Sequence, residues 1–160
     1  PHATPSDRII SAGDALTLDF GCLYNHYVSD MTRTIYAGHV SDKEREIYET
    51  VLKANQALIA EAKDGLGFRD FDKIPRDIIE AAGYGQYFSH GIGHGIGLDI
   101  HEEPYFNQAS KEVIKAGMVL TDEPGIYIEG LSGVRIEDDL LITESGCEVL
   151  TLAPKELIVI

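Results

Sequence analysis

The chain has 160 residues, of which 44% are hydrophobic and 25% are charged, and this composition is typical of a folded globular domain. Its 27 acidic residues outnumber 13 basic ones, and the net charge of −14 argues against nucleic acid or an anionic membrane as a partner. No run of about 18 apolar residues predicts a membrane span. Two cysteines, Cys22 and Cys147, are too few for a disulfide framework, so we expect a cytoplasmic protein with reduced thiols.

The N-terminal part is expected to form a β-hairpin followed by a helix. Ala15–Gly21 and His26–Gly38 have the alternating pattern of half-buried strands, and we place the turn at Tyr24 and Asn25. The segment Ser41–Glu44 matches a capping box, so a helix should begin there. Its buried stripe is expected to include Ile47, Val51 and Leu58.

A second helix and several strands are expected in the rest of the chain. Phe68–Gly85 has a helical pattern, in which Pro75 must lie in the first turn or kink the helix and Gly83 suits the C-terminal cap. The expected strands are Met118–Glu129, Gly133–Gly146 after a turn at Leu131–Gly133, and Cys147–Thr151. Two helices with mostly antiparallel strands indicate one α+β domain over residues 1–160.

Two acids in the first hairpin are placed so that the predicted turn would bring them together. Asp19 lies five residues before Tyr24, and Asp30 lies five residues after Asn25, which sets their β-carbons about 4.5–5.5 Å apart. Two ionised carboxylates at that distance repel each other. Both must then face solvent, or one must be protonated, or a cation must lie between them.

Glu123 and Glu137 repeat this arrangement around the second predicted turn. Pro124 cannot donate to a strand ladder, so this register is less firmly fixed. Arg135 lies two residues before Glu137 and should share its face. An ordinary salt bridge from Arg135 to Glu137 or Asp138 would also explain it.

The stretch Ser89–Pro104 contains three histidines, His90, His94 and His101, and four glycines. Carboxylates with one imidazole suit a pair of divalent ions such as Mn²⁺, Co²⁺, Fe²⁺ or Zn²⁺. The glycines would let the backbone pass close to such a site, with His94 as a ligand. A glycine-flanked histidine can equally be a loop residue that only donates and accepts hydrogen bonds.

Four segments together resemble one protein family. They are "LDFG…YVSDMTRT", "HGIGHGIGLDIHEEP", "LTDEPGIYI" and "GVRIEDDLLIT". In this order they resemble the metal-dependent aminopeptidases of the pita-bread fold, the group of methionine aminopeptidase, aminopeptidase P and prolidase. The second and fourth segments look most like the proline-specific branch, and the resemblance covers nearly the whole chain.

The resemblance implies a role for each candidate residue. It implies that Asp19 binds one metal, that His94 and Glu123 bind the other, and that Asp30 and Glu137 bridge both. The metal expected first is Mn²⁺, with Co²⁺, Zn²⁺ or Fe²⁺ as alternatives. By the same resemblance, the residues that face the peptide or the reacting atoms are His2, His90, His101, Glu123 and Arg135.

The implied reaction is hydrolysis of the N-terminal Xaa-Pro bond of a peptide by a hydroxide that bridges two metals, with Glu123 moving the proton. The implied substrate carries proline at its second position, and the resemblance does not separate aminopeptidase P from prolidase. A non-catalytic relative that binds peptides or proteins is the alternative, although such relatives typically lose metal ligands and all five are present here.

The family's catalytic domain is usually longer on its N-terminal side. The resemblance therefore implies that residues 1–160 are the C-terminal portion of the domain, incomplete at the N-terminal side. We expect such a chain to be inactive alone, or to associate as a homodimer or through the missing half.

Overall fold

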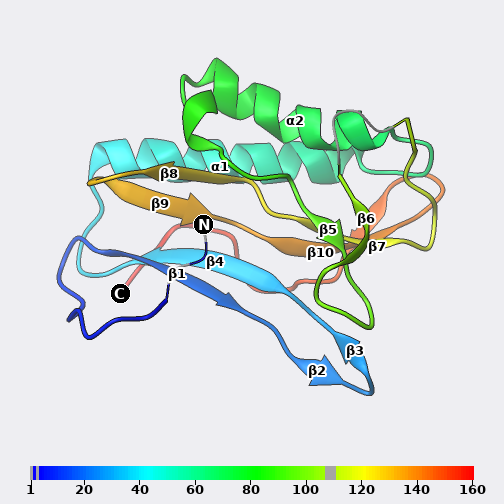
Figure 1. The fold of residues 1–160 in the computed structure, drawn as a ribbon. Coiled ribbons are helices and arrows are strands. Elements are labelled where there is room, and N and C mark those ends of the chain that lie inside the picture. The colour runs from blue at the N-terminus through cyan, green and yellow to red at the C-terminus, as the bar shows by residue number, and fades with distance from the viewer. Residues whose placement is uncertain (1, 3, 107–110) are drawn as a thin grey trace.

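The computed structural model describes residue 2, residues 4–106 and residues 111–160. In these residues two helices lie on one side of a set of mostly antiparallel strands (Figure 1). Helix α1 (Asp42–Glu61) contacts the strands, and α2 (Phe68–Ala81) packs on α1. The α+β class is confirmed. No helix within the described residues is both long and apolar enough to cross a bilayer.

The first hairpin is present but its turn lies one residue later than the sequence predicts. Strand β1 (Ala15–Phe20) pairs with β4 (Met31–Tyr36), and the short strands β2 (Leu23–Tyr24) and β3 (Tyr27–Val28) extend the hairpin to its tip. The tip is the pair Asn25 and His26, with φ of 48° and 71°. Positive φ at both central residues is the geometry of a two-residue type I′ turn, which matches the twist of the strands.

This shift corrects one expectation about the acids. Asp19 lies opposite Thr32 in the β1–β4 register, not opposite Asp30. The predicted single strand from His26 to Gly38 is also interrupted, because Ser29 and Asp30 lie between β3 and β4. Asp30 thus comes from the junction of two strands rather than from the middle of one.

Both helices have the caps that the sequence predicts. Ser41 accepts a hydrogen bond from the Glu44 amide, and the Glu44 carboxylate accepts one from the Ser41 amide, which completes the capping box. At the end of α2, Gly83 has a φ of +86° and donates to the Glu80 carbonyl. Pro75 lies inside α2 and not in its first turn.

The two long strands predicted on either side of a Leu131–Gly133 turn form one hairpin, and each is broken once. The turn lies earlier than predicted, between Ile128 and Ser132, because Ser132 and Gly133 already belong to the second strand. The half nearer the turn consists of β8 (Gly125–Ile128) and β9 (Ser132–Arg135), and the other half of β7 (Val119–Asp122) and β10 (Asp138–Ile142). Both halves share one register, which pairs Gly125 with Arg135 and Asp122 with Asp138. The expectation that Glu123 faces Glu137 is therefore confirmed.

At the break, the backbone of each strand forms hydrogen bonds with another segment of the chain. Pro124 has no N–H to donate. The Glu137 amide instead donates to the Thr32 carbonyl over 3.0 Å, and the Glu123 amide donates to the Ile92 carbonyl over 2.9 Å. Each glutamate is thereby fixed to a segment that carries another candidate ligand, because Thr32 follows Asp30 by two residues and Ile92 precedes His94 by two.

Short elements complete the fold. They are the 3₁₀ turn Gly85–Tyr87, β5 (His94–Gly95), β6 (Glu102–Tyr105), β11 (Cys147–Val149) and β12 (Ile158–Val159). The strand orders are β1-β4-β12 and β11-β10-β7-β5-β6. The apolar core lies between α1 and the strands, and Ile47, Val51 and Leu58 of the predicted stripe are fully buried in it.

Candidate metal centre

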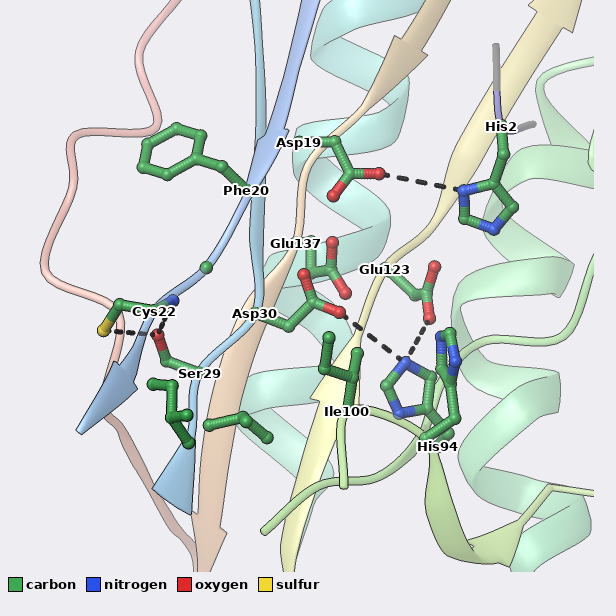
Figure 2. A pocket seen from close by; sticks show the side chains of 14 residues that line it. His2, Asp19, Phe20, Cys22, Ser29, Asp30, His94, Ile100, Glu123 and Glu137 are labelled. Carbon is green, nitrogen blue, oxygen red and sulfur yellow. Dashed lines mark hydrogen bonds and ion pairs between the residues drawn. The ribbon is translucent and has the colours of Figure 1, made fainter. Parts of the chain in front are cut away.

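The four acids and three histidines, His2, His94 and His101, line one cavity of about 450 Å³. Figure 2 shows the carboxylates of Asp19, Asp30, Glu123 and Glu137 converging from β1, the β3–β4 junction and the broken hairpin. His94 closes the cavity from β5. Apart from the acids and histidines, the cavity is lined by apolar or small residues, which are Phe20, Gly21, Cys22, Leu23, Val28, Ser29 and Ile100.

Asp19 lies at the mouth of the cavity with its side chain 33% exposed. One carboxylate oxygen accepts a hydrogen bond from Nη2 of Arg135 and lies 4.0 Å from Nδ1 of His2. Arg135 is 2% exposed and also donates to Tyr127 Oη over 2.9 Å and to Thr32 Oγ1 over 3.1 Å. The ion pair of Arg135 is thus with Asp19, and not with Glu137 or Asp138.

Asp30 is held through its backbone. Its amide donates to Oδ2 of Asp139 over 3.1 Å, and its own Oδ2 lies 4.0 Å from Nε2 of His94. Burial, with the nearby charge of Asp19, raises the pKa of Asp30. The carboxylate therefore faces the cavity in a setting that disfavours its negative charge.

The imidazole of His94 has a defined tautomer. Its Nδ1 lies 3.0 Å from the Gly95 carbonyl, which can only accept, so Nδ1 carries the proton. Nε2 then has a free lone pair, which lies 3.5 Å from Oε1 of Glu123. Burial lowers the pKa of His94, so the ring is neutral at neutral pH. A lone pair directed at two ionised carboxylates is repelled, so either a carboxyl proton or a cation must lie between them.

Two threonines orient the two glutamates. Thr32 Oγ1 donates to Glu137 Oε2 over 2.5 Å. Thr121 Oγ1 donates to Glu123 Oε1 over 3.3 Å and accepts from the His94 amide over 2.9 Å. Neither threonine was identified from the sequence. The spacing of Thr121, two residues before Glu123 on the same face of a strand, could have indicated it.

Burial makes the charged form of both glutamates costly. Burial, together with the charges of Glu123 and Asp30, raises the pKa of Glu137 to about 9. Burial raises the pKa of Glu123 to about 7, although Arg135 opposes the shift. Of the alternatives for paired acids, solvation is excluded for these two side chains by their burial. Protonation and a bound cation remain.

The other two histidines differ in position. His101 is exposed at the cavity wall, and its ring lies edge-on to that of His94 with centroids 4.3 Å apart. His90 does not line the cavity. Its Nδ1 donates to the Gly91 carbonyl over 2.8 Å, and its Nε2 accepts from Tyr127 Oη over 2.9 Å. Burial lowers the pKa of His90 to about 4, so it is neutral.

Two further features of the site were not identified from the sequence. Tyr127 links His90 to Arg135, and nothing local in the sequence indicates this contact. Cys22 is exposed on the cavity wall, with its thiol 3.4 Å from Ser29 Oγ, while Cys147 is half-buried.

The possible ligand atoms fall into overlapping groups, in each of which they lie within 4.8 Å of one another. Asp19, Asp30 and Glu137 form one group, and His94, Glu123 and Glu137 form a second. Asp30 also joins His94 and His101 in a third. Glu137 belongs to the first and second groups and Asp30 to the first and third, so the donor set could hold two divalent ions that share carboxylates. A carboxylate-rich cluster with one neutral imidazole fits such ions, and fold and site together define a candidate metalloprotein.

The chain belongs to metallopeptidase family M24, whose model matches residues 1–144. It is 52% identical over 158 residues to an Xaa-Pro dipeptidase of Pyrococcus furiosus, covering 99% of this chain and 45% of that protein. Among solved structures, the Xaa-Pro dipeptidase from Bacillus anthracis matches with a TM-score of 0.97 and 51% identity. The X-Pro aminopeptidase from Thermotoga maritima matches with a TM-score of 0.95 and 39% identity.

Both structural matches cover 100% of this chain and 45% of the other chain. The pita-bread fold inferred from the sequence is confirmed. The chain thus spans about half the length of the relatives it matches.

Proposed function

We propose that the protein hydrolyses the N-terminal Xaa-Pro bond of short peptides with two divalent metal ions. The observation that carries the proposal is the convergence of Asp30, Glu123 and Glu137 on the unprotonated Nε2 of a neutral His94, with Asp19 grouped beside Asp30 and Glu137. The names of its relatives support the Xaa-Pro substrate. In this proposal residues 1–160 are the C-terminal portion of a longer catalytic domain.

Asp19, Asp30 and Glu137 would hold one ion, and His94, Glu123 and Glu137 the other, with Asp30 placed to contact both. The predominance of carboxylate oxygens favours Mn²⁺ over softer ions, with Co²⁺, Fe²⁺ or Zn²⁺ as alternatives. When bound, such ions supply Lewis acidity and lower the pKa of water.

The protein's own residues would share the remaining work. Glu123 has a pKa of about 7, which suits a group that takes up and returns a proton near neutral pH. His101 is exposed beside His94 and can donate to a peptide carbonyl in the cavity. His2 lies at the mouth near Asp19 and would face the substrate. Arg135 would position Asp19 through their ion pair.

His90 has a different part in the proposal. Both of its ring nitrogens are hydrogen-bonded to protein groups, Gly91 and Tyr127. A contact between His90 and a peptide therefore requires exchange of one of these bonds, and the Tyr127 hydroxyl is the exchangeable partner.

We propose a cytoplasmic location for the protein from its small number of cysteines alone, and this stays a prediction.

The test uses the full-length protein after chelation. Titration with Mn²⁺ in a calorimeter should give two bound ions per chain, and hydrolysis of Xaa-Pro and Xaa-Pro-Yaa peptides should return with them. Peptides without proline at the second position serve as the control substrate. Binding of peptide without Mn²⁺ and without cleavage would instead support the non-catalytic alternative. Mn²⁺ binding that survives replacement of both Glu123 and Glu137 by Gln would refute the assignment of ligands.

The role of His101 is tested separately. His101→Ala should keep both ions and lose about 10²–10³ in turnover, the usual cost of removing a hydrogen bond to the transition state. His39→Ala, at an exposed histidine outside the cavity, is the matched control. Loss of one ion in His101→Ala would show that His101 is a ligand with Asp30 and His94.

A further inference from the structure

A second polar cluster lies directly behind the candidate metal centre. Asp122 and Asp138 are each 0% exposed and are paired across β7 and β10. Each adjoins a candidate ligand, Glu123 or Glu137. Successive side chains of a strand point to opposite faces, so these aspartates project away from the cavity while sharing backbone with the glutamates that line it.

The cluster contains two cations and one amide. Asn55 Nδ2 of α1 donates to Oδ2 of Asp122 over 3.0 Å and to Oδ2 of Asp138 over 2.9 Å. Lys155 Nζ lies 2.5 Å from Oδ2 of Asp138 and donates to Asn55 Oδ1 over 3.1 Å. Arg33 Nη2 donates to Oδ1 of Asp138 over 2.8 Å. Both cations contact Asp138, and the Asn55 amide contacts both aspartates, so partners from distant parts of the chain hold this pair.

The C-terminal segment is fixed in place by the same groups. Arg33 donates to the carbonyls of Ala153 and Pro154, each over 2.9 Å. Through Nη1 it also donates to the carbonyl of Glu137 over 2.6 Å. The Tyr48 hydroxyl donates to the Lys155 carbonyl over 3.0 Å. One arginine therefore connects the segment that carries Lys155 to the backbone of a candidate metal ligand.

We propose that Lys155 is a positioning residue that sets the separation of Glu123 and Glu137 and, through it, the affinity for the metal ions. The ammonium group donates to Asn55, whose amide bridges Asp122 and Asp138, and it also compensates the charge of Asp138. Without the ammonium group, the Asn55 amide loses the contact that orients it between the two aspartates. The adjoining glutamates then lose part of the framework that sets their separation. The inference rests on the proposed metal centre but concerns a residue that does not touch it.

The experiment compares Mn²⁺ binding by full-length variants in a calorimeter after chelation, with the ion alone as the probe. Lys155→Met should weaken binding by about 10-fold or more, the range found when groups that orient metal ligands are removed. Lys155→Arg should restore affinity to within about threefold of the wild type, because it keeps the charge. Lys63→Met, at an exposed lysine, makes the same chemical change without a buried partner and should bind as the wild type does.

A charge-balance variant separates positioning from general loss of structure. Asp138→Asn combined with Lys155→Met removes one charge of each sign, so it should bind Mn²⁺ more tightly than Lys155→Met alone. If Lys155→Met does not fold, the double variant is compared with Asp138→Asn, and it should bind at least as tightly.

Three results decide the matter. Lys155→Met with wild-type affinity, or a double variant weaker than both single variants, overturns the inference while the metal centre stands. A wild-type protein that binds no Mn²⁺ overturns the proposed function itself, so the two failures are distinguishable.

Discussion

At the scale of single residues, Thr32 has two functions in the site. Its hydroxyl donates to Glu137 Oε2 and accepts from Arg135 Nε, which in turn is paired with Asp19. Its carbonyl accepts from the Glu137 amide. One buried threonine thus fixes the glutamate that both groups of candidate ligands share.

Thr32→Val keeps the shape of the side chain but removes both hydroxyl contacts. We expect Mn²⁺ affinity to fall about 10-fold, as for other groups that orient metal ligands, and stability to fall by about 1–3 kcal/mol because buried polar groups lose a partner. Calorimetric titration and urea unfolding measure the two effects. Thr17→Val, in exposed β1, is the control. Unchanged affinity in Thr32→Val would mean that Glu137 needs no such support.

At the scale of elements, the glycine-rich stretch allows β5 to approach its neighbours. A β-carbon on Gly93 would lie 2.1 Å from the Thr121 carbonyl oxygen, and one on Gly95 would lie 2.3 Å from that of Glu103. A β-carbon on Gly91 would meet nothing within 4 Å. Gly93 and Gly95 therefore permit a close approach to the backbone of Thr121 and Glu103, whereas Gly91 does not need to be glycine for this reason. The expectation that the glycines bring the backbone close to a metal site stays a prediction.

This difference provides a matched pair of variants. Gly93→Ala should push β5 away from Thr121, which holds the His94 amide and Glu123, so both Mn²⁺ affinity and thermal stability should fall. Gly91→Ala makes the same change in open space and should leave both close to wild type. Differential scanning calorimetry with and without Mn²⁺ provides the measurement. Equal effects of the two variants would contradict the role given to Gly93.

The elements also show which local features the sequence predicts and which depend on tertiary packing. The capping box at Ser41 and the glycine cap at Gly83 are local patterns, and both were correct. The first turn lies one residue later than the sequence predicts because its position depends on a positive φ at His26, a conformation that is uncommon for non-glycine residues even though histidine is enriched in it. Nothing in the sequence near Pro124 indicated that each long strand would change partners there.

The sequence indicates all five candidate ligands from residue type, spacing and family resemblance, and the structure brings them together in one cavity. Their role as metal ligands stays a prediction. The contact of Thr32 with Glu137 and that of Tyr127 with His90 are not indicated by the sequence, because the partners are distant along the chain. Such contacts depend on how elements pack and leave no local pattern.

At the scale of the whole molecule, apolar side chains are exposed around the first hairpin. They include Leu18, Phe20, Leu23, Tyr24, Tyr27, Leu98 and Ile100. Strand β1 is also an edge of its sheet, where unpaired backbone groups can bind further chain. The expected association through this region stays a prediction, as does the incomplete catalytic domain.

The buried acids make the stability of the metal-free protein fall as the pH rises. Glu137 has an ordinary pKa of 4.5 and a pKa of about 9 in the fold, raised first by burial. Between these values the folded protein holds a proton that the unfolded chain releases, so stability falls as pH rises. From pH 7 to 9 the neutral His90 no longer titrates, since burial lowers its pKa to about 4.

We therefore expect the chelated protein to lose on the order of 1 kcal/mol per pH unit between pH 7 and 9. With saturating Mn²⁺ the slope should vanish or reverse, because ions bind the deprotonated carboxylates and stabilise only the folded state. Urea unfolding at fixed pH, with EDTA or Mn²⁺, measures both slopes. Glu137→Gln in EDTA should flatten the fall and leave the part due to Glu123 and Asp122, whose pKa values burial also raises. If stability fell equally with pH in EDTA and in Mn²⁺, no metal ion would be replacing the protons that these carboxyl groups hold.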